Sequence, residues 1–153
     1  MIIIILSIIF FFIDYLTKHV IINNIPLGVS NKVINNFFYI TYVNNKGAAF
    51  SILNGKTFLL VIITIIIILM LINYIRKNNI KDKLSILSIS LVIGGSLGNL
   101  LDRVVRGYVV DFLDFHIFGY DFPVFNVADT FITVGVFLLF ISLNRKENNH
   151  DSK

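Results

Sequence analysis

Four long apolar stretches dominate the 153-residue chain, and they restrict its possible folds more than any other feature. Each is about 17 to 21 residues long, the length that a helix needs to cross roughly 30 Å of hydrocarbon. Four helices buried in a soluble core are excluded, because 56% of the residues are hydrophobic and only 14% are charged, which leaves too little polar surface to cover them. We therefore predict a single-domain α-helical membrane protein with four transmembrane helices, at residues 2–22, 57–75, 84–101 and 127–143.

The distribution of basic residues predicts how these helices are oriented. Six basic residues lie in the link between the second and third stretches or just after the fourth: Arg76, Lys77, Lys81, Lys83, Arg145 and Lys146. Because cytoplasmic loops carry an excess of Lys and Arg, both termini and the short tail 144–153 are expected in the cytoplasm. The loops 23–56 and 102–126 then lie outside, although they carry five basic residues of their own. The net charge of +4 does not indicate nucleic acid, and no such partner is expected.

The chain contains no cysteine, which excludes disulfides, thiol nucleophiles and thiolate metal sites. Its N-terminus is apolar from Ile2, with no basic leader and no small-residue cleavage site before Asp14. We therefore expect the first apolar stretch to stay in the mature protein as a transmembrane helix, not to act as a removable signal peptide.

The two outer loops contain patterns that are typical of strands. Residues 35–45 are rich in aromatic and β-branched side chains between asparagines, and residues 107–125 resemble two strands joined at residues 119–121. Between them, residues 47–53 ("GAAFSIL") are short and apolar and suggest a small helix at the membrane interface. The sequence thus predicts a small β-structure that rests on the outer side of the bilayer.

Five of the nine acidic residues fall within one stretch of 28 residues on the outer side. There, Asn126 precedes Asp129 by three residues, a pattern typical of a helix start with an acid in its first turn. Two carboxyl groups held close together share a proton, and such a pair can activate water for amide hydrolysis. The residues alone do not select the pair, because Asp114 and Asp121 compete with Asp111 as the partner of Asp129.

Polar groups within the third apolar stretch have two possible roles. Asn99, Asp102 and Arg103 share one face of a helix, because they are three and four residues apart. They can form interhelical hydrogen bonds and an Asp102–Arg106 ion pair, or they can position the acids or a substrate headgroup. Both interpretations stay open.

Asp14 and Lys18 in the first stretch are four residues apart and can pair on one helix face. The cost of placing such groups in a membrane is reduced if they snorkel, as a pair, toward the outer boundary. Alternatively, the pair acts as a scaffold beneath the outer loops.

Three other functional classes fit the sequence less well. Residues 94–98 match the G-x-S-x-G nucleophile pattern, but that motif follows a strand and these residues lie in an apolar helix. The three histidines are scattered and no H-E-x-x-H occurs, which argues against a metalloprotease. A transporter or assembly factor with Asp14 and Lys18 as an ion relay has no use for the outer acids, and no pair of broken, symmetric helices occurs.

Five motifs follow one another along the chain: "DYLTK" (14–18), "NKGAAF" (45–50), "GGSLGNLLDR" (94–103), "VDF" (110–112) and "FNVAD" (125–129). In this order and spacing they resemble the motifs of the lipoprotein signal peptidases (signal peptidase II), which are membrane aspartic peptidases of bacteria. V-D-F is the weakest motif alone, but jointly the five are very specific and extend from the first apolar stretch to the last.

The resemblance implies an aspartic endopeptidase that cleaves a prolipoprotein just before its diacylglyceryl-modified cysteine, without a cofactor or a metal. It selects Asp111 and Asp129 as the catalytic pair. Eight further positions are implied to bind substrate or to support the site: Asn45, Gly47, Asn99, Arg103, Asn126, Asp14, Lys18 and Asp102. The last three are expected to be more structural than the others.

The resemblance also implies a four-helix bundle with a small extracytoplasmic β-cradle and a short interfacial helix. It implies a location in the bacterial cytoplasmic membrane, with the active site at the outer face. The expected partners are prolipoproteins, membrane lipids and globomycin-type inhibitors, and we expect the chain to act as a monomer. Asp114 matches no catalytic position; we expect it to point the same way as Asp111 from its strand and to have a structural task.

Overall fold

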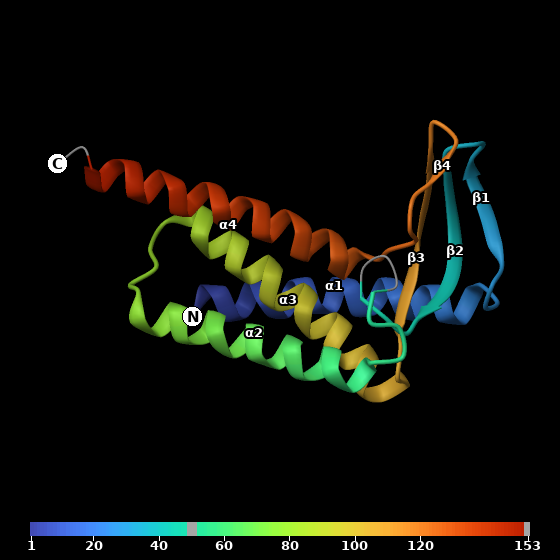
Figure 1. Cartoon of the computed structure of the whole chain (residues 1–153), viewed down its shortest axis with the longest axis horizontal. Coiled ribbons are helices and arrows are strands. Elements are labelled where there is room, and N and C mark those ends of the chain that lie inside the picture. Colours follow the sequence, from blue (N-terminus) through green and yellow to red (C-terminus); the bar gives the residue numbers. More distant parts are fainter. Residues whose placement is uncertain (49–51, 152–153) are drawn as a thin grey trace.

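The computed structural model describes residues 1–48 and 52–151 of the chain. These residues form the following elements: α1 (Ile2–Asn24), β1 (Ser30–Ile34), β2 (Phe38–Asn45), α2 (Thr57–Lys77), α3 (Lys83–Arg106), β3 (Val109–Ile117), β4 (Tyr120–Asp121) and α4 (Val127–Asp151). The helices lie side by side, and the sheet stands across one end of the bundle, called the sheet end below (Figure 1). Both chain termini and the link between α2 and α3 lie at the opposite end (Figure 1).

The four helices are long and apolar enough to cross a membrane, which confirms the predicted fold class. With 21 residues at about 1.5 Å each, α2 is roughly 31 Å long. It exposes most of its apolar side chains, as a helix that faces lipid must. In contrast, 67% of the membrane-spanning part of α3 is buried, because α3 packs against all three other helices. This buried helix, α3, carries Asn99, Asp102 and Arg103, the polar residues that were predicted to share one helix face.

Glycines allow α3 to approach its neighbours closely. A Cβ atom on Gly94 would lie 2.7 Å from the backbone oxygen of Ser7 in α1, and one on Gly95 would lie 2.6 Å from that of Ala128 in α4. Any side chain at either position would push the helices apart. Because residues 94–98 lie inside α3, their G-x-S-x-G pattern is not a strand-to-helix turn.

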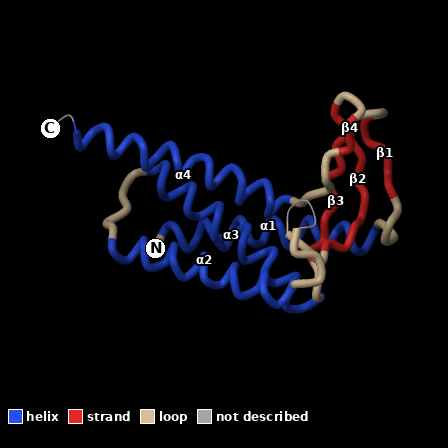
Figure 2. The backbone as a smooth tube through the Cα atoms, in the orientation of Figure 1, coloured by secondary structure: helices blue, strands red, loops and turns tan. Residues whose placement is uncertain are grey.

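The strands form an antiparallel sheet in the order β1-β2-β3-β4 (Figure 2). β2 pairs with β3 along its length, from Phe38 opposite Phe115 to Asn45 opposite Val109, with an irregularity between Ile40 and Val43. This pairing joins loops that are far apart in the sequence. It places Asn45 beside the start of β3, which continues from the end of α3.

The strands agree with the sequence analysis in part. β2 lies within 35–45 as predicted, and β3 and β4 lie within 107–125, although their turn is at residues 118–119 rather than 119–121. β1 was not predicted, because its sequence "SNKVI" begins with polar residues. The small helix expected at 47–53 includes residues 49–51, which lie outside the described residues.

Helix ends also differ from the predicted boundaries. α3 continues to Arg106 and ends at Gly107, whose φ of 80° is the left-handed conformation that glycine adopts without strain. α4 continues as a helix to Asp151, through the segment that the sequence suggested as a short tail. The apolar stretches thus locate the helices but underestimate their length.

Candidate active site

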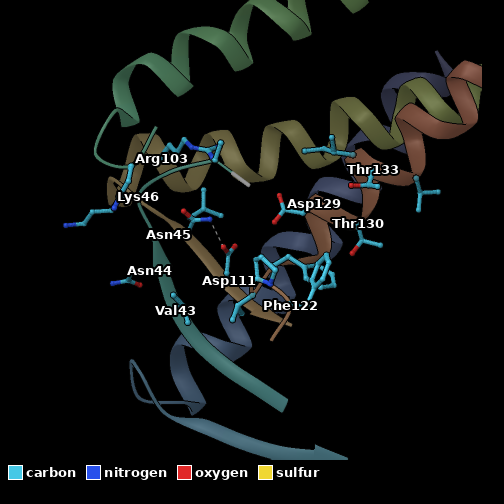
Figure 3. Close-up of a pocket in the computed structure, with 18 residues that line it drawn as sticks. Val43, Asn44, Asn45, Lys46, Arg103, Asp111, Phe122, Asp129, Thr130 and Thr133 are labelled. Carbon is cyan, nitrogen blue, oxygen red and sulfur yellow. Dashed lines mark hydrogen bonds between the residues drawn. The ribbon is translucent and has the colours of Figure 1, made fainter. Parts of the chain in front are cut away.

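A cavity of about 670 Å³ opens where the sheet meets the helices, and both Asp111 and Asp129 line it. Its walls come from β2, the end of α3, β3, the segment 122–125 and the first turns of α4. In Figure 3 the two carboxyl groups point into the cavity from β3 and from α4. Most of the surface that lines the cavity is apolar.

Asp111 is almost completely buried, with 2% of its surface exposed. Its carboxyl group accepts a 2.8 Å hydrogen bond from Asn45 Nδ2 of β2 and a 2.6 Å bond from Asn126 Nδ2. Burial raises the pKa of Asp111 to about 7, and the charge of Asp129 acts in the same direction, while the two amide hydrogen bonds oppose the rise. This carboxyl group therefore holds a proton more readily than an exposed aspartate does.

Asp129 is held in the first turn of α4 by a reciprocal cap. Asn126 Oδ1 accepts a hydrogen bond from the backbone N–H of Asp129 at 2.9 Å, and Asp129 Oδ2 accepts one from the backbone N–H of Asn126 at 3.2 Å. This confirms the helix start predicted from "FNVAD". The other carboxylate oxygen accepts a 2.8 Å hydrogen bond from Asn99 Nδ2 of α3. The N-terminal end of the helix dipole stabilises negative charge on this carboxyl group, against the cost of burying it.

Asn126 connects the two acids directly. Its side-chain NH2 group donates to Asp111, and its backbone N–H donates to Asp129. The same NH2 group also donates to Asn99 Oδ1 at 3.2 Å. One fully buried residue thus fixes both carboxyl groups relative to each other.

Lys18 lies beneath this network, buried between helices. Its ammonium group contacts three acceptors: Asp14 at 2.8 Å, Asn99 Oδ1 at 2.8 Å and Asp102 at 3.2 Å. These three acceptors match the three N–H donors of the ammonium group. The predicted Asp14–Lys18 pair is therefore present, but snorkelling is wrong, because Asp14 and Lys18 are 0% and 3% exposed. The polar groups of neighbouring helices replace water as their partners.

Asp14 and Asp102 tie this buried charge cluster to the elements that carry the two acids. Asp14 accepts a 2.8 Å hydrogen bond from the backbone N–H of Ala128, next to Asp129. Asp102 accepts one at 3.1 Å from the backbone N–H of Val110, next to Asp111. Asp102 also forms the predicted ion pair with Arg106, at 3.1 Å. The cluster therefore anchors the backbone on both sides of the cavity.

Arg103 and Gly47 lie at the rim. Arg103 Nη2 donates a 3.0 Å hydrogen bond to the backbone oxygen of Gly47, and Asn45 Oδ1 accepts a 2.8 Å bond from the Gly47 N–H. Arg103 lines the cavity together with Lys46, a residue that the sequence analysis did not select (Figure 3). These contacts bind the loop after β2 to the end of α3.

The competing acids lie elsewhere, and the expected direction of Asp114 is wrong. Asp114 accepts a 2.5 Å hydrogen bond from Thr41 and contacts His116 at 3.2 Å, and Asp121 contacts His116 at 2.7 Å. Neither acid lines the cavity. The reason is the alternation of a strand: residues three apart, such as Asp111 and Asp114, point to opposite faces.

Sequence reasoning also missed several lining residues of α4 and of the segment before it. Thr130 and Thr133 line the cavity one and four residues after Asp129 (Figure 3). Helix periodicity could have placed Thr133 on the face of Asp129, because residues four apart are neighbours. No local pattern marks Phe122 or Phe125, whose places depend on how the segment 122–125 packs beside β3.

Comparisons with known proteins agree with one another. A family model described as "Signal peptidase (SPase) II" matches residues 6–145. The lipoprotein signal peptidase of Bacillus pumilus (strain SAFR-032) is 45% identical over 130 residues, which cover 85% of this chain and 84% of that protein. The protein of the same description from Staphylococcus aureus (strain MRSA252) is 44% identical over 140 residues, covering 92% and 86%. A solved structure, described as a bacterial membrane enzyme studied by the in meso method at 2.3 Å resolution, has a TM-score of 0.88 and 42% identity, covering 96% of this chain and 90% of that one.

Proposed function

Because the chain belongs to the signal peptidase II family of lipoprotein signal peptidases, it is a peptidase, and we propose that Asp111 and Asp129 form its catalytic pair. The observation that carries this proposal is the double contact of Asn126, which donates to Asp111 through its side chain and to Asp129 through its backbone. Two carboxyl groups fixed in this way, in a largely apolar cavity, are arranged to share one proton.

In the proposed reaction Asp129 is the base and Asp111 is the acid. Asp129 is favoured as the ionised member by the helix N-terminus and by hydrogen bonds from Asn99 and Asn126. Asp111 is the member that holds the proton, because burial raises its pKa to about 7. Asp129 removes a proton from water, the hydroxide attacks the scissile carbonyl carbon, and Asp111 donates its proton to the carbonyl oxygen.

The tetrahedral intermediate then breaks down, and each of the two acids transfers its proton in the opposite direction. Asp129 gives the proton it received to the leaving amine nitrogen as the C–N bond breaks, and Asp111 takes its own proton back as the carbonyl forms again. The sum is the addition of one water molecule across the amide bond, and both acids return to their starting states. The buried amides of Asn99 and Asn126 hold the carboxyl groups in place during these transfers.

The substrate proposed for this site is a prolipoprotein that carries a diacylglyceryl-modified cysteine, cut just before that cysteine. The cavity combines the two acids with apolar side chains on α4, including Ile132 and Val134, against which acyl chains can pack. The extended segment of the signal peptide would lie along β2 and β3, whose cavity edge offers Asn44 and Asn45. Membrane lipids surround the spans, and globomycin-type peptides are proposed to block the same cavity in a monomeric enzyme.

The location of the ends of the chain supports the proposed orientation. Both termini and the basic link between α2 and α3 lie at the end of the bundle opposite the sheet (Figure 1). Since positive loops stay in the cytoplasm, the proposal places the sheet end and the active site at the outer face of the bacterial cytoplasmic membrane.

The experiment is cleavage of a purified diacylglyceryl-modified precursor by the purified protein, with and without globomycin. Asp111→Asn and Asp129→Asn are each expected to abolish cleavage, while expression and membrane insertion stay normal. Asp114→Asn and Asp121→Asn are matched controls, because they remove an acid from the same sheet outside the cavity and should retain cleavage. Cleavage at the wild-type rate by either Asp111→Asn or Asp129→Asn would refute the catalytic pair.

A further inference from the structure

The turn between β3 and β4 exposes a group of apolar side chains, called the hairpin tip: Ile117, Phe118 and Tyr120. Their exposed fractions are 41%, 106% and 61%, so Phe118 is as accessible as the side chain of an extended peptide. Such a residue on a water-facing turn leaves a large apolar surface in contact with water. Contact with an apolar ligand or an apolar surface would bury this area and remove the free-energy cost of exposing it to water.

The backbone conformation of the turn does not explain why a phenylalanine occupies position 118. Ile117 pairs with Tyr120, so Phe118 and Gly119 form a two-residue loop, and both have positive φ, 51° and 78°. Loops of this kind favour Asn-Gly, because a bulky side chain is strained at positive φ. Phe118 is therefore a bulky residue in a strained backbone conformation, and its side chain is fully exposed at the end of the hairpin.

The sheet beneath the tip has one aromatic and one polar face. On the aromatic face, Phe115 packs on Phe38 and Phe125, with ring centroids 4.6 and 5.8 Å apart, and Phe122 packs on Phe125 at 5.9 Å. Phe122 and Phe125 also line the cavity, so this face continues from the cavity toward the tip. The opposite face carries the hydrogen-bonded and charged groups Thr41, Asp114, His116 and Asp121, together with Tyr39, whose ring packs on that of His116 with centroids 4.8 Å apart.

The hairpin tip belongs to the edge of the sheet that leads into α4. β4 is the edge strand that leads through the segment 122–126 into α4, whereas β1 forms the opposite edge. Figure 1 shows the start of β3 next to the helices and the β3–β4 turn at the other end of the sheet, beyond the side of the bundle on which α4 lies, while the lower end of β1 lies near the end of α1. Because the strands run across the end of the bundle, the tip projects sideways beyond the helices, at the end of the bundle where α4 enters its apolar span (Figure 1).

We propose that the hairpin tip inserts into the lipid leaflet at the sheet end and anchors the edge of the sheet to the bilayer surface. The partner is the interface of a lipid bilayer, where Phe and Tyr side chains are stable because their rings reach apolar groups while the Tyr hydroxyl stays hydrated. The contact continues the lipid-facing surface of α4, which exposes Val134 and Phe137. It holds the segment 122–125, a wall of the cavity, at the membrane surface, and it does not depend on the catalytic roles of the acids.

The test uses tryptophan fluorescence, because the chain contains no tryptophan of its own. Phe118→Trp is reconstituted in phosphatidylcholine vesicles with and without brominated acyl chains, which quench only residues in contact with lipid. Val33→Trp on β1 is the matched control, since Val33 is also exposed, at 54%, but lies on the edge strand opposite β4. Phe137→Trp on α4, at a position 63% exposed, serves as the lipid-facing reference.

The expected result for Phe118→Trp is an emission maximum shifted to the blue and severalfold stronger quenching by brominated lipid than for Val33→Trp. Tyr120→Trp should behave in the same way, and it keeps the test valid if the larger ring at position 118 disturbs the turn. Emission from positions 118 and 120 that resembles tryptophan in water, with no more quenching than at position 33, would overturn the proposal.

Discussion

Lys18 donates a 2.8 Å hydrogen bond to the side-chain oxygen of Asn99, and this contact decides which way the amide of Asn99 faces. Because the oxygen is turned toward Lys18, the NH2 group is turned toward Asp129, to which it donates at 2.8 Å. The buried lysine of α1 therefore orients a proposed catalytic carboxylate without touching it. Lys18 is a positioning residue in this scheme.

Lys18→Met is expected to lower both stability and cleavage. It leaves Asp14 and Asp102 buried without their shared cation, and breaking a buried ion pair in this way costs about 3–5 kcal/mol. Thermal unfolding in detergent and cleavage per folded molecule would measure the two effects. Lys32→Met is the control, since Lys32 is an exposed residue of β1, and it should change neither quantity. An unchanged melting temperature for Lys18→Met would contradict the role given to the cluster.

Asp14→Asn separates a peptidase from an ion relay. An asparagine can still accept the hydrogen bond from the backbone of Ala128, but it loses the charge that pairs with Lys18. We expect a lower melting temperature, with most of the cleavage per folded molecule retained, because Lys18 keeps its contact with Asn99. Full stability combined with complete loss of activity would instead indicate that Asp14 carries protons.

The parts of the site that the sequence predicts correctly are local in the chain. The Asp14–Lys18 and Asp102–Arg106 pairs are four residues apart, and the cap of Asn126 and Asp129 spans three, so helix geometry alone fixes them. The membrane spans are predictable for a related reason, since each is a continuous apolar run.

The parts that the sequence could not predict depend on tertiary contacts. Asn45 and Asp111 are 66 residues apart and meet only because β2 pairs with β3 in one particular register. Lys18 and Asn99 are 81 residues apart and meet only because α1 packs on α3. For the same reason the sequence could not decide between snorkelling and a scaffold for Asp14 and Lys18, because a local pattern does not show which groups of other helices will surround a side chain.

Gly98→Ala should destabilise the protein through Asp14. A Cβ atom at position 98 would occupy the space of the Asp14 carboxyl group, so either the helices separate or the carboxyl group moves away from Lys18 and Ala128. Overpacking of this kind typically costs about 1–3 kcal/mol. Thermal unfolding would detect it, with Val104→Ala, an exposed change on the same helix, as a control of small effect. A melting temperature equal to that of the wild type would show that the site is less tightly packed than the contacts indicate.

The rate of cleavage should fall as the pH rises above about 7. The pKa of Asp111 is about 7 because burial disfavours its charged form, so this group is protonated below that pH and loses its proton above it. In the proposed mechanism Asp111 donates this proton to the carbonyl oxygen. When both carboxyl groups are ionised, the site has no proton donor for that step. Initial rates across the neutral and alkaline range would give the profile, and melting temperatures at each pH would exclude unfolding. A rate that increases steadily through this range would contradict the assignment of Asp111 as the acid.

Cleavage should survive metal chelators, since the proposed reaction uses only two carboxyl groups and water. Incubation with a chelator before addition of the modified precursor would test this, with globomycin as the positive control for inhibition. Loss of activity on chelation, restored by adding back a divalent metal, would favour a metal site over the proposed pair.

The stability of the Asp111→Asn variant relative to the wild type should rise with pH, although the substitution abolishes the proposed activity. The pKa of Asp111 rises from 3.8 to about 7 on folding, so between these values the folded state binds more protons than the unfolded state. The wild type therefore loses stability as the pH rises through this window, and the loss is complete above about 7. Asparagine does not titrate and avoids the loss. The melting temperature of the variant relative to that of the wild type should thus rise from about pH 4 to about pH 7 and then level off, whereas a difference independent of pH would show that the charge of Asp111 is not the destabilising factor.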